Sequence, residues 1–284
     1  MSQLVRHKRI LAALALCAAF VWAAKALPSA GNITLHFVLL PPSVIEKRLE
    51  EPPDVNTKRE LALRAMFEAA GCGPAQLSEQ AVRPDDPPNL VCEMPGESPE
   101  LIIVAGHLDH VRKGEGVVDD WSGAAMLPSL YESLRSVPRK HTFLFIGFTD
   151  EEKGLVGSSF YVRHLSHGQA AEIRAMVNLE CLGMNPPEVW ADHANPRLLA
   201  DLRLISRSLG MSLPVVNAED YGSDDAESFR KRKLPTITIH SVTQDTLHVL
   251  HSRDDNLAAI HMPYYYEAYR LVANYLAYLD STLP

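Results

Sequence analysis

The sequence lacks the features of several protein classes. Its 27 Lys and Arg residues form no long run that could follow a phosphate backbone, and 35 Asp and Glu residues give a net charge of -8. We therefore expect no nucleic-acid partner. No repeat occurs at the periods of solenoids or propellers. With 15 Gly, 20 Pro and 46% apolar residues, the chain is neither fibrous nor disordered and can bury a sizeable core. We therefore expect one domain that is large enough to be an enzyme.

The amino terminus has an apolar run that is too short for a comfortable membrane span. Residues 10–24 are fifteen apolar residues that follow three basic residues within positions 6–9, whereas a span needs ~20. This arrangement is typical of an export signal, and small residues predict cleavage after Ala26. Residues 27–284 would then be the exported domain, periplasmic or secreted. Pro28 can hinder cleavage, so an uncleaved membrane anchor is the alternative.

Export to an oxidising compartment permits disulfide bonds. Cys72 and Cys92 flank a segment that contains Pro and Gly, and a bridge between them would close a surface loop and leave Cys181 unpaired. The alternative is that all three are small buried apolar residues. The sequence leaves both readings open.

The exported part alternates between short apolar runs and segments with helical spacing. Four apolar runs predict strands that are covered on both faces, at 101–104, 142–146, 175–179 and 236–239. Helices are expected at about 122–136, 157–166, 196–209, 225–232 and 263–279. Before the first strand we expect two helices within 43–71, interrupted at 51–53, and a long connection with one strand over 73–99. This order predicts an α/β fold: a single domain whose mostly parallel, mixed central sheet is covered by helices on both faces.

Histidine and carboxylate side chains follow the four predicted strands. They are His107, Asp109, Asp119 and Asp120 after the first strand, Asp150, Glu151 and Glu152 after the second, Glu180 after the third, and His248, His251, Asp254 and Asp255 after the fourth. Ligands bind beyond the carboxyl ends of such strands, so we expect one shared rim. So many carboxylates would raise one another's pKa unless divalent cations lay between them. Imidazole with carboxylate suits zinc, with cobalt or manganese as substitutes, and no thiolate ligand is required.

Each of these groups has an ordinary explanation when it is taken singly. Acidic pairs occur in solvated turns and at helix starts, and with 12 histidines in the chain a lone one is usually a surface or core residue. Their order and their common position at strand ends favour the metal site.

Six motifs carry a family resemblance. In order they are Gly106-His-Leu-Asp109, Gly116-Val-Val-Asp-Asp-Trp-Ser-Gly123, Phe148-Thr-Asp-Glu-Glu-Lys-Gly-Leu-Val-Gly-Ser158, Asn178-Leu-Glu180, Gly222-Ser-Asp224 and His251-Ser-Arg-Asp-Asp255. This combination resembles the co-catalytic di-zinc exopeptidases of the bacterial leucyl-aminopeptidase type, whose relatives include the glutamate carboxypeptidases and the glutaminyl cyclases. The resemblance covers about residues 55–280. It implies the three-layer sandwich of the zinc exopeptidases, also described as phosphorylase/hydrolase-like.

The resemblance implies a role for each matching residue. Asp119 would bridge two zinc ions, with His107 and Glu180 completing one site and Glu152 and His251 the other. Glu151 would be the general base. Asp109 would hold the second nitrogen of the His107 ring, and Asp120 would follow a peptide bond that is cis in the family.

Two positions depart from the family pattern or leave a choice. The residue at Glu180 is more often Asp, and the longer side chain can still bind a metal but can alter metal spacing. His240, His248 and His251 all lie near the last ligand position. We choose His251 because of the residues that follow it, with His248 as the second choice.

The function that follows is a zinc-dependent aminopeptidase with a peptide substrate. The alternatives are a glutaminyl cyclase-like acyltransferase, a carboxypeptidase and an inert peptide-binding relative. Four aromatic side chains are candidates for the walls of a substrate pocket, with core packing as the alternative for each: Trp121, Trp190, Tyr221 and Phe229.

Overall fold

The computed structural model describes residues 33–217 and 222–284. The expected export segment, 1–26, lies outside the described residues, as does Tyr221. Residues Leu35–Pro284 form one unit that contains all the elements below. In the part of the chain that the structure describes, no helix is both long and apolar enough to cross a membrane.

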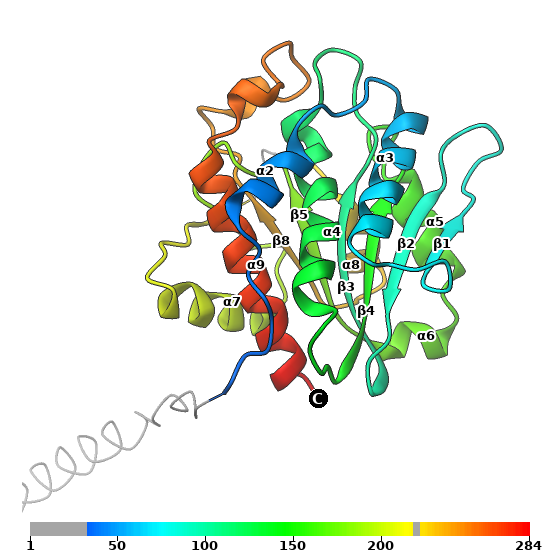
Figure 1. Ribbon diagram of the computed structural model, residues 1–284, viewed down its shortest axis with the longest axis vertical. Coiled ribbons are helices and arrows are strands. Elements are labelled where there is room, and N and C mark those ends of the chain that lie inside the picture. Colours follow the sequence, from blue (N-terminus) through cyan, green and yellow to red (C-terminus); the bar gives the residue numbers. More distant parts are fainter. Residues whose placement is uncertain (1–32, 218–221) are drawn as a thin grey trace, which may run out of the picture. The chain divides into compact units, whose positions relative to one another are not determined.

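A mixed sheet of eight strands forms the centre of this unit (Figure 1). The strands are β1 (Leu77–Gln80), β2 (Asn89–Met94), β3 (Ser98–His107), β4 (His141–Phe148), β5 (Ile173–Glu180), β6 (Glu188–Trp190), β7 (Val215–Val216) and β8 (Thr236–His240), in the spatial order β1-β2-β4-β3-β5-β8-β6-β7. The four central strands, β4, β3, β5 and β8, run parallel. On either side, β2 is antiparallel to β4 and β6 is antiparallel to β8. The predicted mostly parallel, mixed sheet is confirmed.

Helices cover both faces of the sheet. They are α2 (Pro42–Leu49), α3 (Asn56–Ala69), α4 (Ser122–Leu134), α5 (Val156–His164), α6 (His167–Glu172), α7 (Pro196–Ser208), α8 (Asp225–Lys231) and α9 (Met262–Thr282). One face packs against α2, α3, α4, α7 and α9, and the other packs against α5 and α8. Successive side chains of β3 point to opposite faces of the sheet. Ile102 and Val104 pack in the core under α4 and α9, and Ile103 and Ala105 pack in the core under α5 and α8. A strand that is buried on both faces therefore has a continuous apolar sequence.

Several short elements were not predicted from the sequence. The single strand expected over 73–99 is wrong, because this segment contains the antiparallel pair β1 and β2 as well as the start of β3. The residues of β1 are mostly polar and none is buried, so it has no apolar run. Strands β6 and β7 are three and two residues long, and α6 has no buried residue that would mark a helical period.

A disulfide bond joins Cys72, just beyond α3, to Cys92 in β2. Cys181 is unpaired and buried. The predicted bridge between Cys72 and Cys92 is present. The alternative prediction is right in one respect, because all three cysteines are buried. The bond closes the loop between α3 and the second strand of the sheet.

Candidate metal centre

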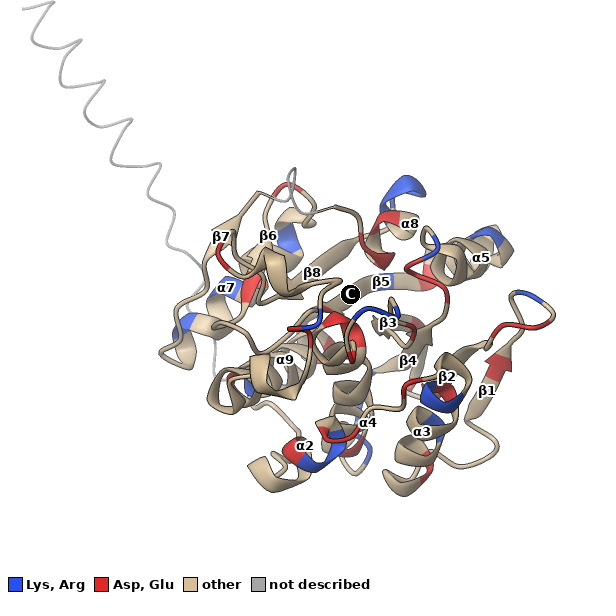
Figure 2. Cartoon of the chain, turned by 90° about the horizontal axis from the view of Figure 1, so that it is seen from above, with Lys and Arg blue, Asp and Glu red and all other residues tan. Residues whose placement is uncertain are grey.

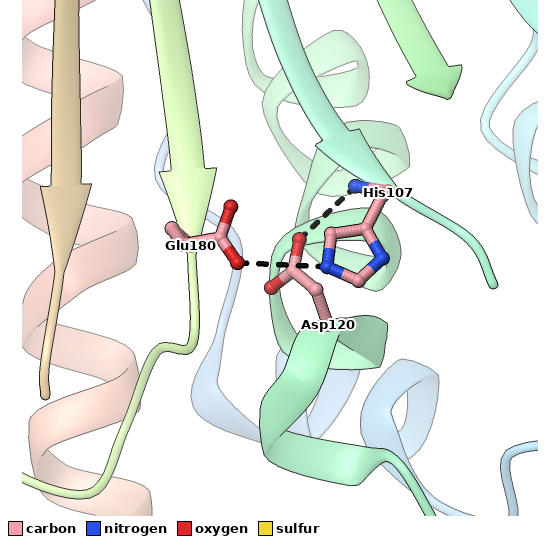
Figure 3. Close-up of side chains that lie close together, drawn as sticks. All are labelled: His107, Asp120 and Glu180. Carbon is pink, nitrogen blue, oxygen red and sulfur yellow. Dashed lines mark hydrogen bonds and ion pairs between the residues drawn. The ribbon is translucent and has the colours of Figure 1, made fainter. Parts of the chain in front are cut away.

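The carboxyl ends of the parallel strands bring acidic and histidine side chains to one rim of the sheet. β3 ends at His107 and its neighbour β5 ends at Glu180. Figure 3 shows the His107 ring directed toward the Glu180 carboxylate, with His107 Nε2 and Glu180 Oε1 3.5 Å apart. Figure 2 looks onto this end of the sheet and shows acidic residues on the surrounding loops. This rim is where open α/β sheets bind ligands.

The Asp119 carboxylate lies between two imidazole rings. Its Oδ1 is 3.1 Å from Nε2 of His107, and its Oδ2 is 3.2 Å from Nε2 of His251. The same nitrogen of His251 is 2.9 Å from Oε2 of Glu152. Each oxygen of Asp119 therefore faces a different imidazole, an arrangement in which one carboxylate can bridge two cations.

Three groups of side chains in the described residues have ligand atoms close enough to share a cation, within 4.8 Å of one another. They are Asp119 with Glu152 and His251, His107 with Asp120 and Glu180, and Asp119 with Glu180 and Cys181. The five side chains that the sequence proposed as ligands thus come together in space. His248 belongs to none of these groups and is exposed.

His240, the third histidine considered for the last ligand position, is occupied elsewhere. It is buried at the end of β8, where its Nδ1 accepts a hydrogen bond from the Val242 N–H and its ring lies 5.0 Å from that of Trp190. Of the three candidates, only His251 lies beside Asp119 and Glu152.

Asp120 is directed toward the main chain. Its carboxylate accepts hydrogen bonds from the N–H groups of His107 (3.1 Å), Gly123 (3.0 Å) and Cys181 (3.0 Å). It thereby ties the end of β3 and the start of α4 to the segment after β5. The peptide bond between Asp119 and Asp120 is cis, as the family resemblance implies. Two consecutive aspartates therefore face different partners.

Asp109 occupies a position that differs in part from the expected one. His107 Nδ1 lies 3.0 Å from the main-chain oxygen of Asp109 and 3.6 Å from its Oδ1, so the carbonyl is the nearer partner of the ring. The Asp109 carboxylate instead accepts hydrogen bonds from the N–H groups of Glu151 (3.0 Å) and Glu152 (3.2 Å). It therefore fixes the turn that presents both glutamates.

The electrostatics of the centre favour a bound cation. Burial and nearby carboxylates raise the pKa of Glu151 to about 10 and that of Glu152 to about 7. The hydrogen bond to Asp119 raises the pKa of His251 to about 9. Glu152 Oε1 is buried and has no hydrogen-bond partner among the described residues. Cations between these oxygens would offset the repulsion, and the imidazole and carboxylate donors fit zinc.

A cavity of about 280 Å³ opens onto the centre. Its described lining includes four carboxylate residues, Asp119, Glu151, Glu152 and Glu180, and the apolar side chains Trp190, Val242 and Leu250. Of the aromatic residues that the sequence offered as pocket walls, Trp190 lines this cavity, whereas Trp121 and Phe229 are packed in the core.

Two residues hold the loop that carries Asp119, and sequence reasoning assigned neither of them this role. Asp255, which the sequence offered only as part of the closing motif, accepts hydrogen bonds from the N–H groups of Val118 and Asp119. The buried Arg59 donates to the carbonyl of Gly116, and nothing in the local sequence around Arg59 indicates this contact.

An open α/β sheet that gathers imidazoles around a central carboxylate at its carboxyl rim is suited to metal-dependent hydrolysis. The chain belongs to peptidase family M28, whose model matches residues 89–276. Leupeptin-inactivating enzyme 1 of Streptomyces exfoliatus is 31% identical over 151 residues, which make up 52% of this chain and 34% of that protein. The chain spans about a third of the length of the first curated relatives it matches.

Two solved structures show the same fold. BSAP, a zinc aminopeptidase from Bacillus subtilis, matches with a TM-score of 0.62 and 24% identity over 68% of this chain and 50% of that one. A glutaminyl cyclase from an Acidobacteriales bacterium matches with a TM-score of 0.72 and 17% identity over 90% of this chain and 99% of that one. The fold predicted from the sequence is thus that of known zinc aminopeptidase and glutaminyl cyclase structures.

Proposed function

We propose that this chain is a zinc-dependent aminopeptidase that removes the amino-terminal residue of a peptide. The observation that carries the proposal is the position of Asp119, with one oxygen toward His107 and the other toward His251. In this proposal Asp119, His107 and Glu180 would hold one zinc ion, and Asp119, Glu152 and His251 would hold the other. Cobalt or manganese would be substitutes.

The proposed reaction is hydrolysis of an amide by an activated water. Zinc would polarise the scissile carbonyl and lower the pKa of the attacking water. The Glu151 carboxylate would take the proton from this water and pass it to the departing amine. Glu151 suits this role because it lines the cavity, lies 3.9 Å from His107 Nε2 and belongs to neither proposed ligand set. Asp109 would keep it in place through the hydrogen bond to its N–H.

The lining of the cavity suits a substrate whose first side chain is apolar. Four carboxylate residues and no Lys or Arg are found in the described lining. Two bound zinc ions would balance the charge of these carboxylates, so the choice of the amino end of the peptide rests on the aminopeptidases to which the chain is similar. The apolar wall of Trp190, Val242 and Leu250 can contact the first side chain of the substrate.

Glutaminyl cyclisation is the second candidate function. The observation that favours it is that the likeness to the Acidobacteriales glutaminyl cyclase covers 99% of that chain. In this reaction one zinc ion would polarise the γ-carbonyl of an amino-terminal glutamine, which the α-amino group attacks with loss of ammonia. The two candidates differ in metal stoichiometry as well as in product, because cyclisation needs one ion and the proposed hydrolysis two.

A substrate panel with metal analysis tests the proposal. The purified protein is incubated with leucine p-nitroanilide, with its N-acetyl derivative, with a glutaminyl peptide and with a peptide that ends in glutamate. We expect two zinc equivalents and p-nitroaniline release only from the free-amino substrate. A chelator should abolish this release, and added zinc should restore it. Ammonia release from the glutaminyl peptide would support the cyclase. Loss of the terminal glutamate would support a carboxypeptidase, and metal binding without turnover an inert relative.

Export of the domain is a separate part of the proposal. Residues 1–26 would direct the chain out of the cytoplasm, either as a cleaved signal that releases residues 27–284 or as an anchor that keeps the domain at the membrane. Intact-mass measurement of the protein from its producing cells distinguishes the two. A mature chain that begins at Leu27 supports cleavage, and an intact residue 1–26 segment in the membrane fraction supports the anchor.

A further inference from the structure

Two charged side chains from distant parts of the chain hold the loop that carries Asp119. The first is Arg59 in α3, which is fully buried. Its Nε donates to the carbonyl of Pro53 (2.9 Å), its Nη1 to the carbonyl of Gly116 (3.1 Å) and its Nη2 to the carbonyl of Glu115. The guanidinium lies 5.4 Å from the centre of the Trp121 ring. Its hydrogen-bond acceptors among the described residues are thus main-chain carbonyls, and the guanidinium faces an aromatic ring.

The second is Asp255, which contacts the same loop from the segment after β8. Its Oδ1 accepts a hydrogen bond from the Val118 N–H (2.7 Å) and its Oδ2 one from the Asp119 N–H (3.4 Å), while its main-chain oxygen accepts one from the Glu115 N–H (2.8 Å). Gly114 allows this close approach, because a Cβ there would lie 2.2 Å from the Ser252 oxygen. The two loops are therefore in direct main-chain contact.

These contacts link the two halves of one proposed metal site. His251 lies four residues before Asp255 in the same loop, and Asp119 lies in the loop that Asp255 and Arg59 hold. These hydrogen bonds therefore connect the two segments that bring Asp119 Oδ2 and His251 Nε2 within 3.2 Å of each other. Loss of either side chain would leave buried main-chain groups unsatisfied and free the loop to move.

We propose that Arg59 and Asp255 are positioning residues that set the affinity of the Asp119–Glu152–His251 site for its metal ion. This inference rests on the proposed function, because it requires that site to bind metal. It also assigns a role to α3, which lies before the family-matched residues 89–276. The helix then supports the loop that carries Asp119 and also covers the sheet.

The test compares zinc affinity in matched arginine variants. Arg232 offers the control, because it also donates to main-chain carbonyls, those of Val162 and Leu165, on the opposite face of the sheet. The zinc dissociation constants of wild type, R59M, D255N and R232M are measured by competition with a chromophoric chelator. Removal of an outer-shell partner typically weakens metal binding about tenfold to a hundredfold. We expect that loss in R59M and D255N and no change in R232M.

Further measurements separate positioning from folding. R59K keeps the charge but cannot make the three-pronged contact, so we expect an intermediate zinc affinity; if R59M fails to fold, R59K decides. The R59M/D255N double variant should lose less than the product of the two single losses, because both act on one loop. Zinc affinity in R59M or R59K within twofold of R232M would overturn the inference. A wild-type protein that binds no zinc would overturn the proposed centre itself.

Discussion

Replacement of Glu151 by glutamine is the sharpest test of the proposed chemistry. The side chain is partly buried beside the centre, with 12% of its surface exposed, lies 3.9 Å from His107 Nε2 and belongs to neither proposed ligand set. Glutamine has nearly the same volume as glutamate, and the main-chain N–H of residue 151 can still donate to the Asp109 carboxylate as in the wild type. We therefore expect E151Q to fold and to keep its metal while it loses the proton acceptor.

The expected size of the effect follows from general base catalysis. Such a group contributes about 10²- to 10⁴-fold to the rate, which corresponds to about 3–5 kcal/mol in the activation free energy. The assay is kcat on leucine p-nitroanilide together with metal content by mass spectrometry. E152Q is the matched control, because Glu152 is a proposed ligand next in sequence and its replacement should remove one metal equivalent. Ordinary turnover in E151Q, or loss of metal from it, would refute the assignment of Glu151 as the base.

Three further predictions address the metal centre and the fold. We expect H251A to lose one metal equivalent and H248A to keep both, measured by metal analysis; equal losses would contradict the choice of His251. In the metal-free folded protein, the pKa of Glu152 is raised from 4.5 to about 7 and that of His251 from 6.5 to about 9. Between the lower and the higher value of each group, the folded state binds more protons than the unfolded chain. Stability should therefore fall as the pH rises from about 6 to 8, so the metal-free protein should melt at a lower temperature at pH 8, and bound zinc should diminish or reverse this trend. Finally, replacing Cys72 and Cys92 by alanine should lower the free energy of unfolding by roughly 3 kcal/mol, because the bridge closes a loop with a sequence separation of 20. Denaturant unfolding should show a lower midpoint in this variant while its activity is unchanged. An unchanged midpoint would contradict a stabilising role for the bridge.

The central sheet and the meeting of the proposed ligands could be predicted from the sequence for a physical reason. Strands buried on both faces need continuous apolar runs, and parallel strands bring their carboxyl ends to one rim. His107 and Glu180 each end such a run, so their proximity follows from topology alone. The edge strand β1 has mostly polar residues and gave no comparable signal.

The contacts of the centre with the main chain could not be predicted in the same way. Arg59 reaches a carbonyl 57 residues away, and Asp255 reaches an N–H 137 residues away. Such contacts depend on the final path of two loops and leave no period in the sequence. The same holds for Asp109, whose type and spacing suggested a partner for the His107 ring, whereas the folded turn places two main-chain N–H groups nearer to its carboxylate.

The paired aspartates after Gly116 make this loop intolerant of length changes. Asp119 points toward the two imidazoles, while Asp120 is hydrogen-bonded to main-chain N–H groups from three segments. Insertion or deletion of a single residue between Gly116 and Gly123 would displace at least one of the two carboxylates from its partners, although the composition would hardly change. Variation among natural homologues at this point should therefore be confined to substitutions, with gaps found only outside these two glycines.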